Sequence, residues 1–360
     1  MPVEMIGWIA PRVSSEVVAA QGPAFDPAVI AHTARLHEAA GFDRVLIGYF
    51  SDAPDGFMVG AHAATVTERL QFLLAHRPGF VAPTLAARKL ATLDQLTGGR
   101  LGVHIISGGS DADQARDGDF TTHAERYRRS AEYVSLLRRT WTSPVPFDHD
   151  GEFYRVKSAF SDIRCRQSPH IPVFGGGGSD AAVSMLSPVL DVFMLWGEPL
   201  AETAAFMSRV RRAAEDAGRP APRFSLSTRP ILAETEDKAW ERARLLLQRL
   251  VAMRKGVPPP APENVGSKRL LAVAARGEVQ DTCLWMKLAE ATGARGNSTA
   301  LVGTPETVAK ALVAYYRLGA TSLLIRGYEP LEDTDAYGRE LIPLVRRLVA
   351  EADAEKGREG

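Results

Sequence analysis

The sequence predicts an α/β protein built as a closed (β/α)8 barrel, the TIM-barrel fold, and three observations support this. Eight short apolar runs suited to strands recur along the 360 residues, helical patterns separate them, and the chain is long enough for one large core. Alternating strands and helices form a parallel sheet, and eight such units favour a closed barrel over an open doubly wound sheet. The expected strands occupy residues 5–10, 44–49, 70–75, 101–107, 171–176, 191–196, 223–233 and 321–326.

Helix boundaries are marked by ordinary start and stop signals. Residues 83–96 open with proline and end before the Gly98-Gly99 pair, which predicts a complete helix. Thr122 and Glu125 have the spacing of a capping box, so a further helix is expected to begin immediately after Thr122.

Two segments are longer than a minimal barrel needs. We expect residues 143–170 to form an irregular excursion with a small hairpin. Residues 253–298 include a proline cluster, and we expect them to form a mobile lid or insertion. We therefore expect a single domain over residues 1–350, followed by a charged, frayed tail at 351–360.

Charge and cysteine content exclude several classes of function. Lys plus Arg and Asp plus Glu both number 43, so no net field attracts nucleic acid or an anionic membrane. The N-terminal residues lack the pattern of a signal peptide, which predicts a cytoplasmic protein. Cys165 and Cys283 are expected to be reduced thiols. The eight histidines form no HExxH motif, so we expect no metal site.

Chemistry in a barrel lies at the carboxyl ends of its strands, and the segment after residues 101–107 is informative there. His123 and Tyr127 are four residues apart and share one face at the start of a helix. That end of the helix dipole stabilises anions, so the pair is a candidate anion site. Simple packing at a helix start explains the spacing equally well.

The run VFGGGGSDAA, residues 173–182, joins an expected strand to a helix. Four glycines followed by Ser179 allow a ligand such as a phosphate to approach the backbone closely. The run is not a dinucleotide fingerprint, because Asp180 stands where that motif requires glycine. A plain glycine-rich turn is the alternative.

Taken together, the segments HIISGGSDADQARDGDFTTHAERY, VFGGGGSDAA, MLWGEP, STALVGTPETVAKAL and RGYEPLED resemble one known family. From about residue 5 to residue 345 the chain is similar to the FMNH2-dependent alkanesulfonate monooxygenases of the bacterial luciferase-like superfamily. The resemblance implies O2 as co-substrate and reduced FMN supplied by an NAD(P)H-dependent flavin reductase. It also implies cleavage of the carbon–sulfur bond of an organosulfonate, with release of sulfite and an aldehyde. We further expect a homo-oligomer, either a dimer or a tetramer.

The cofactor side of the resemblance is close. His104 replaces an asparagine of the family and is interpreted as a cofactor contact, with a satisfied core histidine as the alternative. The resemblance assigns the isoalloxazine edge to Ser107 and Gly108, and the phosphate end to His123, Tyr127, Gly177, Gly178 and Ser179.

The substrate side departs from the family pattern. Ala53 replaces a family cysteine, and Ser227 and Arg229 replace an arginine and a histidine two residues apart. One guanidinium is thus retained, and Arg229 is predicted to clamp a sulfonate, with a salt bridge at the barrel rim as the alternative. The general base is not assigned, and His104 is the nearest replacement. These departures predict an altered substrate, bulkier or hydroxylated, such as a sulfosugar.

Three further residues match the family wholly or nearly. Trp196 is expected to wall the pocket, Tyr328 to hydrogen-bond the substrate, and Arg295, offset by one residue, to close over an anion and exclude water. A core aromatic and a solvated loop arginine are the ordinary alternatives for Trp196 and Arg295.

Two other functions remain open at this point. One is a luciferase-like flavin monooxygenase acting on a sulfone, an alkane or an aldehyde. The other is a non-redox TIM-barrel enzyme, or a barrel that only binds flavin, with the glycine run binding the phosphate of a substrate.

Overall fold

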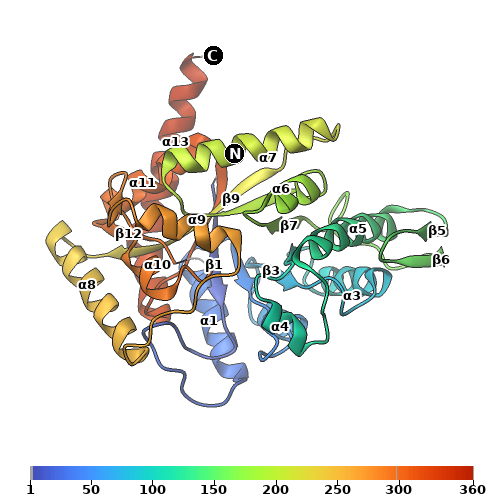
Figure 1. Cartoon of the computed structure of the whole chain (residues 1–360), viewed down its shortest axis with the longest axis horizontal. Coiled ribbons are helices and arrows are strands. Elements are labelled where there is room, and N and C mark those ends of the chain that lie inside the picture. Colours follow the sequence, from blue (N-terminus) through green and yellow to red (C-terminus); the bar gives the residue numbers. More distant parts are fainter. Residues whose placement is uncertain (1–2, 297, 360) are drawn as a thin grey trace. The chain divides into compact units, whose positions relative to one another are not determined.

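The computed structural model describes residues 3–296 and 298–359, and its main feature is a closed barrel of parallel strands (Figure 1). The strand order is β9-β13-β1-β2-β3-β4-β7-β8, and β8 also pairs with β9, which closes the barrel. Each of these strands overlaps a run that the sequence predicts, so the expected fold class is confirmed. The strands are β1 (Glu4–Ile9), β2 (Arg44–Ile47), β3 (Gln71–His76), β4 (Leu101–Ile105), β7 (Val173–Gly176), β8 (Val192–Trp196), β9 (Arg223–Leu232) and β13 (Ala320–Ile325).

Contacts along the chain group it into two compact units. Unit 1 comprises Met1–Val45, Met194–Ser208 and Arg223–Gly360, and unit 2 comprises Leu46–Phe193 and Arg209–Pro222. The single domain expected from the sequence stays a prediction.

Unit 1 extends the parallel strands with three short ones. β12 (Ala300–Gly303) runs parallel to the second half of β9, with Ala300 opposite Arg229, and β11 (Leu284–Trp285) pairs antiparallel with β12. β10 (Val279–Gln280) is antiparallel to β11. The helices and the π-helical turn η1 of this unit are α1 (Pro27–Ala39), α8 (Glu236–Met253), α9 (Val265–Ala274), α10 (Lys287–Thr292), α11 (Pro305–Leu318), α12 (Pro330–Ala336), η1 (Tyr337–Leu341) and α13 (Ile342–Glu359), with the start of α7 (Leu200–Asp216).

Most of the expected lid, residues 253–298, is packed into unit 1. α9 buries Leu270 and Val273, and α10 buries Leu288 in the core that also contains Ile231 of β9. Residues 254–264 between α8 and α9 are mostly exposed and lack regular structure. The motion of the lid stays a prediction, and the structure places the exposed part of the segment at 254–264.

The C-terminal tail is helical. Residues 351–358 are a mostly exposed part of α13, visible at the end marked C in Figure 1, and the expected fraying stays a prediction. Alanine, glutamate and lysine dominate this stretch, and all three are good helix formers.

Unit 2 contains the predicted helix at its expected bounds, α3 (Pro83–Leu96). α3 packs along α5 (His123–Thr142), where Trp141 Nε1 donates to the carbonyl of Ala87 at 2.9 Å. The excursion contains the expected hairpin, β5 (Phe147–Asp150) and β6 (Arg155–Ala159), which lies beyond the end of α5 (Figure 1). The remaining helices are α2 (Gly56–Ala64), α4 (Asp111–Arg116), α6 (Asp180–Leu186) and the end of α7.

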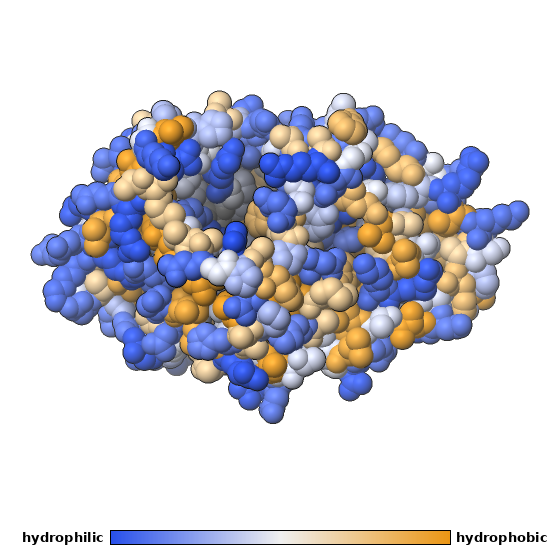
Figure 2. Space-filling view, turned by 90° about the horizontal axis from the view of Figure 1, so that it is seen from below, coloured by the Kyte–Doolittle hydropathy of each residue, from blue (hydrophilic) through white to orange (hydrophobic). Residues whose placement is uncertain are grey.

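The surface carries mixed polarity. Figure 2 shows hydrophilic residues spread over the face viewed, with hydrophobic residues in small groups between them. Within the described ranges, no helix has both the length and the apolar character needed to cross a membrane. Cys165 and Cys283 are both free.

Candidate functional site

The start of α5 has the predicted capping box. Thr122 Oγ1 accepts from the backbone N–H of Glu125 at 3.3 Å, and Glu125 Oε2 accepts from the backbone N–H of Thr122 at 2.8 Å. This cap fixes the first turn, where the rings of His123 and Tyr127 meet edge to face with centroids 4.9 Å apart. The expected pairing of these two side chains is confirmed.

The glycine run meets Tyr127 at the junction of β7 and α6. The hydroxyls of Tyr127 and Ser179 are hydrogen-bonded to each other, and Ser179 Oγ also accepts from the N–H of Ala182 at 3.1 Å. A Cβ atom on Gly177 would lie 2.5 Å from the Tyr127 hydroxyl oxygen and 2.6 Å from Ala182 Cβ. Glycine is therefore required at 177 because two neighbours fill the space of a side chain.

We call His123, Tyr127, Gly177, Gly178 and Ser179 the glycine cradle. Burial and the nearby Arg126 guanidinium lower the pKa of His123, and burial raises the pKa of Tyr127. Both side chains are therefore uncharged near neutral pH. Neutral hydrogen-bonding groups beside a half-exposed glycine backbone are suited to a phosphate, whose oxygens accept from N–H and O–H groups.

Ser107 and Gly108, the other predicted cofactor residues, lie in the loop after β4. Gly108 has φ +87°, and a Cβ there would lie 1.4 Å from Gln114 Nε2, so only glycine fits. Gln114 is fully buried and donates to the Ser107 carbonyl at 3.3 Å. The hydroxyls of Ser107 and Ser130 are 2.9 Å apart, which fixes Ser107 against α5.

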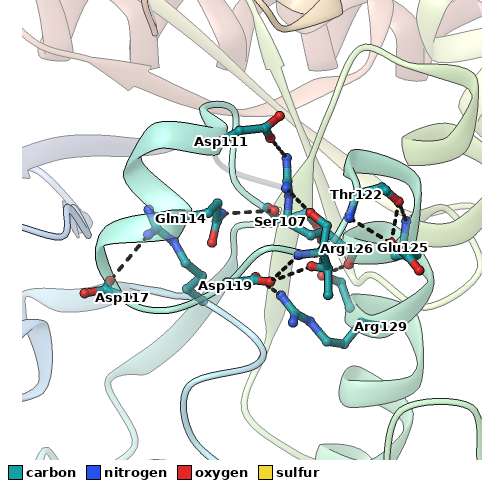
Figure 3. A network of polar contacts seen from close by, with 12 residues as sticks. Ser107, Asp111, Gln114, Asp117, Asp119, Thr122, Glu125, Arg126 and Arg129 are labelled. Atoms are coloured by element: carbon teal, nitrogen blue, oxygen red, sulfur yellow. Dashed lines mark hydrogen bonds and ion pairs between the residues drawn. The ribbon is translucent and has the colours of Figure 1, made fainter.

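Arginines of α5 hold the same loop, as Figure 3 shows. Arg126 is buried and donates to Asp111 at 2.6 Å and to the Thr121 carbonyl at 2.6 Å. Arg129 is paired with Asp119. Burial alone would raise the pKa of Asp119, but hydrogen bonds from Arg129 and Thr121 outweigh it and hold that pKa at about 2. Sequence reasoning missed these anchors, although several acidic residues precede the helix that carries both arginines.

A third arginine, Arg77, fixes α4 from the end of β3. Its buried guanidinium is paired with Asp113, lies 3.6 Å from Asp117, and stacks 4.5 Å above the Tyr49 ring. Tyr49 in turn donates to Asp117 at 3.0 Å. Nothing in the local sequence pattern indicates this contact.

His104 presents an uncharged ring nitrogen. It is the fourth residue of β4 and is half-buried, and burial lowers its pKa to about 4. Within the ranges described, its Nδ1 atom has no hydrogen-bond partner. The interpretation of His104 as a cofactor contact therefore stays a prediction that the free nitrogen supports.

Arg229, in unit 1, has its counter-ion already. The side chain is fully buried, with Nη1 2.7 Å from Glu16 Oε2 and Nη2 donating to the Gly327 carbonyl at 2.8 Å. Its guanidinium also lies 3.5 Å from the centroid of the Tyr328 ring. A carboxylate and a carbonyl thus already contact the guanidinium that the sequence assigned to a sulfonate. This contact favours the salt-bridge alternative, and the role of Arg229 as a sulfonate clamp stays a prediction.

Glu16 also binds a second arginine. Arg326, the residue after β13, donates to Glu16 Oε1 at 2.6 Å, and its guanidinium lies 5.1 Å from the Trp8 ring centroid. We call Glu16, Arg229 and Arg326, with the adjoining Trp8 and Tyr328 rings, the arginine cluster. Arg326 follows directly on a barrel strand, a position that marks it as a candidate, yet sequence reasoning passed over it.

Electrostatics fix the charges of the arginine cluster. Burial alone would raise the pKa of Glu16, but Arg229 and Arg326 outweigh it and hold that pKa at about 2. Burial and the neighbouring Arg229 lower the pKa of Arg326 to about 10, and burial raises that of Tyr328 to about 12. Near neutral pH, the cluster therefore contains two cations and one anion.

The other predicted substrate residues lie in unit 1 as well. Tyr328 is fully buried, and its hydroxyl donates to the Ser298 carbonyl at 3.4 Å. Trp196 ends β8 and packs against the start of α9, where a Cβ on Gly266 would lie 2.8 Å from the indole ring. Arg295 is exposed before β12. The structure thus brings Tyr328 to Arg229 and leaves Arg295 at the surface.

No group of His, Cys, Asp or Glu side chains in the described part of the chain has the arrangement of a metal site. A closed parallel barrel with a glycine cradle after one of its strands defines a (β/α)8 protein with a candidate phosphate site. Residues 3–322 match the family model of the luciferase-like monooxygenases. The chain belongs to that family, which makes it an oxidoreductase.

Solved structures share the fold at low identity. EDTA monooxygenase from Chelativorans sp. BNC1 is 17% identical with a TM-score of 0.76, over 96% of this chain and 94% of that one. Riboflavin lyase, solved with modified FMN and riboflavin, is 18% identical with a TM-score of 0.78, over 96% and 92%. The coenzyme F420-dependent tetrahydromethanopterin reductase from Methanopyrus kandleri is 18% identical with a TM-score of 0.71, over 95% and 99%.

Proposed function

We propose that this protein is a two-component flavin monooxygenase that uses reduced FMN and O2 to cleave the carbon–sulfur bond of an organosulfonate. The observation that carries the proposal is the glycine cradle, in which Tyr127 and Ala182 leave no room for a side chain at Gly177 and the hydroxyls of Tyr127 and Ser179 are hydrogen-bonded to each other. A separate NAD(P)H-dependent flavin reductase would supply the reduced FMN. The cytoplasmic location and the homo-oligomeric state stay predictions.

The residues present fit FMN. Backbone N–H groups of Gly177 and Gly178 and the hydroxyls of Tyr127 and Ser179 would hold the phosphate. His104 would offer its unpartnered Nδ1 to the polar edge of the flavin ring. The loop of Ser107 and Gly108, braced by Gln114, would support the ring. Reduced flavin, when bound, supplies the two electrons with which O2 is activated for oxygen transfer.

The proposed reaction balances. The sulfonate R–CH2–SO3⁻ reacts with O2 and FMNH2 to give R–CHO, sulfite, oxidised FMN, water and one proton. One oxygen atom of O2 enters the aldehyde and the other leaves as water. The carbon beside sulfur is oxidised by two electrons, FMNH2 by two, and O2 accepts all four.

The role of the chain is to bind, orient and exclude water. The arginine cluster supplies an excess of positive charge that suits an anionic substrate, and Tyr328 and Trp196 provide apolar ring surface beside polar groups. One protein with this fold is named EDTA monooxygenase, and EDTA is a polyanion. An uncharged sulfone, alkane or aldehyde would make no use of the excess charge.

A second cofactor deserves a direct comparison, because one similar structure depends on coenzyme F420. F420 also carries phosphate, so a phosphate cradle by itself accepts either cofactor. Parallel titrations with reduced FMN and reduced F420 decide between them. We expect FMN to bind more tightly.

The proposal is tested by supplying the purified protein with FMN, a flavin reductase, NADH and air, together with a panel of sulfonates. The panel includes linear alkanesulfonates, aromatic sulfonates and a sulfosugar, and sulfite is measured in each case. Sulfite that depends on the protein, reduced flavin and O2 supports the proposal. If FMN binds and every sulfonate stays intact, while a sulfone, alkane or aldehyde is oxidised, the protein is instead a flavin monooxygenase of uncharged substrates. A protein that binds phosphate but no flavin would be a non-redox barrel.

A further inference from the structure

We propose that Arg326, with the Trp8 ring beside it, is the contact for the anionic group of the substrate, a sulfonate or carboxylate on an organic chain. The inference deepens the proposed function and rests on it for the reaction that follows binding. It replaces Arg229, which the sequence suggested for this role, with the other guanidinium of the arginine cluster.

The arginine cluster has an excess of positive charge. Arg229 and Arg326 share the single carboxylate of Glu16, at 2.7 Å and 2.6 Å, so the cluster keeps one positive charge. A neighbouring cluster in unit 1 shows the balanced arrangement, because Arg242 and Arg249 there meet two carboxylates. A buried excess charge is costly unless an anion compensates it, and a substrate anion would do so.

Arg326 is the more accessible of the two arginines. The Arg229 side chain is fully buried, whereas 25% of the Arg326 side chain is exposed. In the part of the chain that the structure describes, the Nε atoms of both arginines are buried and have no hydrogen-bond partner, so side-chain exposure is what distinguishes the two. An oxygen of a sulfonate or carboxylate can approach the exposed part of Arg326, and a charge-assisted contact with a guanidinium is strong.

An aromatic surface lies beside the Arg326 guanidinium. Trp8 is half-buried near the end of β1, and its ring centroid lies 5.1 Å from the Arg326 guanidinium carbon. A cation against an aromatic face provides a place for an anionic head and an apolar stem at once. The site therefore selects organic anions over both inorganic anions and neutral chains.

The charged and titratable groups around Arg326 allow a test by pH. They are Arg229 from β9, Glu16 from the loop before α1, and Tyr328 from the loop after β13. With the pKa of Arg326 near 10 and that of Glu16 near 2, the net charge is constant from about pH 4 to pH 9. Anion affinity is therefore expected to be flat over that range and to fall as the pH passes 10.

The experiment is calorimetric titration of the protein with 1-pentanesulfonate, with 1-pentanol as the uncharged probe. Arg326→Met is expected to weaken pentanesulfonate binding by about 10- to 150-fold, the effect of one lost charge-assisted contact. Arg326→Lys is expected to recover part of the loss, because ammonium keeps the charge but lacks the planar fork. Glu16→Gln is expected to tighten binding, because it removes the competing carboxylate. The matched control is Arg317→Met, which removes an arginine from an exposed ion pair with Glu355.

Three results would overturn the assignment of Arg326 as the anion contact. Binding by Arg326→Met within threefold of the parent, weaker binding by a folded Glu16→Gln, or equal binding of pentanesulfonate and pentanol overturns the inference. If Arg326→Met does not fold, Glu16→Gln and the comparison of pentanesulfonate with pentanol on the unmodified protein still test it. The proposed function can be refuted independently of the anion site. A protein that binds pentanesulfonate through Arg326 but releases sulfite from no sulfonate refutes the reaction and leaves the anion site intact.

Discussion

Gly177→Ala is the most direct perturbation of the glycine cradle. The added methyl would lie 2.5 Å from the Tyr127 hydroxyl oxygen and 2.6 Å from Ala182 Cβ, about 1 Å inside ordinary contact distance. Tyr127 is buried, so its ring has little room to withdraw. A shift of about 1 Å takes a hydrogen bond out of range, and a charge-assisted bond to phosphate is worth about 1.5–3 kcal/mol. We expect FMN to bind about 10- to 150-fold more weakly.

Fluorescence titration with FMN measures this loss, and riboflavin serves as the matched ligand because it lacks the phosphate. Riboflavin affinity is expected to change by much less than FMN affinity. Gly357→Ala is the control variant, since a Cβ at that position meets no atom within 4 Å. The reasoning is refuted if Gly177→Ala, shown to be folded by circular dichroism, binds FMN as the parent does. Equal losses for FMN and riboflavin would also refute the phosphate assignment.

Three further predictions concern stability and exposure. Gly108→Ala is expected to lower the free energy of unfolding by at least about 2 kcal/mol in urea titrations, because alanine is strained at φ +87° and its Cβ meets Gln114; an unchanged midpoint would contradict this. Limited proteolysis is expected to cut residues 254–264 first, with protection when FMN and a sulfonate are both present, and equal cleavage in the two states would argue against a lid. Folding lowers the pKa of Glu16 from 4.5 to about 2, so its stabilisation is complete above pH 4.5 and is lost as the pH falls toward 2. By pH 3 the parent should lose about 2 kcal/mol more than Glu16→Gln, and parallel pH profiles for the two proteins would rule this out.

The barrel was predictable because its strands are short, buried runs that show little of the periodicity of an amphipathic helix. Runs such as RVLI in β2 are buried on both faces, as parallel barrel strands must be. β12 was missed because it lies outside the minimal eight-strand pattern. It pairs with the second half of β9, and the length of that strand gave no indication of an additional partner.

The two candidate sites differ in how far the sequence reveals them. Each half of the glycine cradle is local, because a capping box fixes His123 and Tyr127, and a strand-to-helix turn fixes Gly177. The arginine cluster is not local. Glu16 comes from an irregular loop and reaches Arg229 and Arg326 more than 200 residues away, so no spacing rule could have paired them.

Oxygen transfer from O2 to the substrate is the central claim, and isotope labelling tests it most directly. The protein, FMN, a flavin reductase and NADH are incubated under ¹⁸O2 with the sulfonate that gives the most sulfite or, if none does, the one that binds most tightly. Mass spectrometry of the aldehyde, trapped as its hydrazone before exchange with water, measures the label. One ¹⁸O atom in the aldehyde and one sulfite released per aldehyde are the predicted result. Aldehyde without label, or NADH consumption that yields only hydrogen peroxide, would contradict the account.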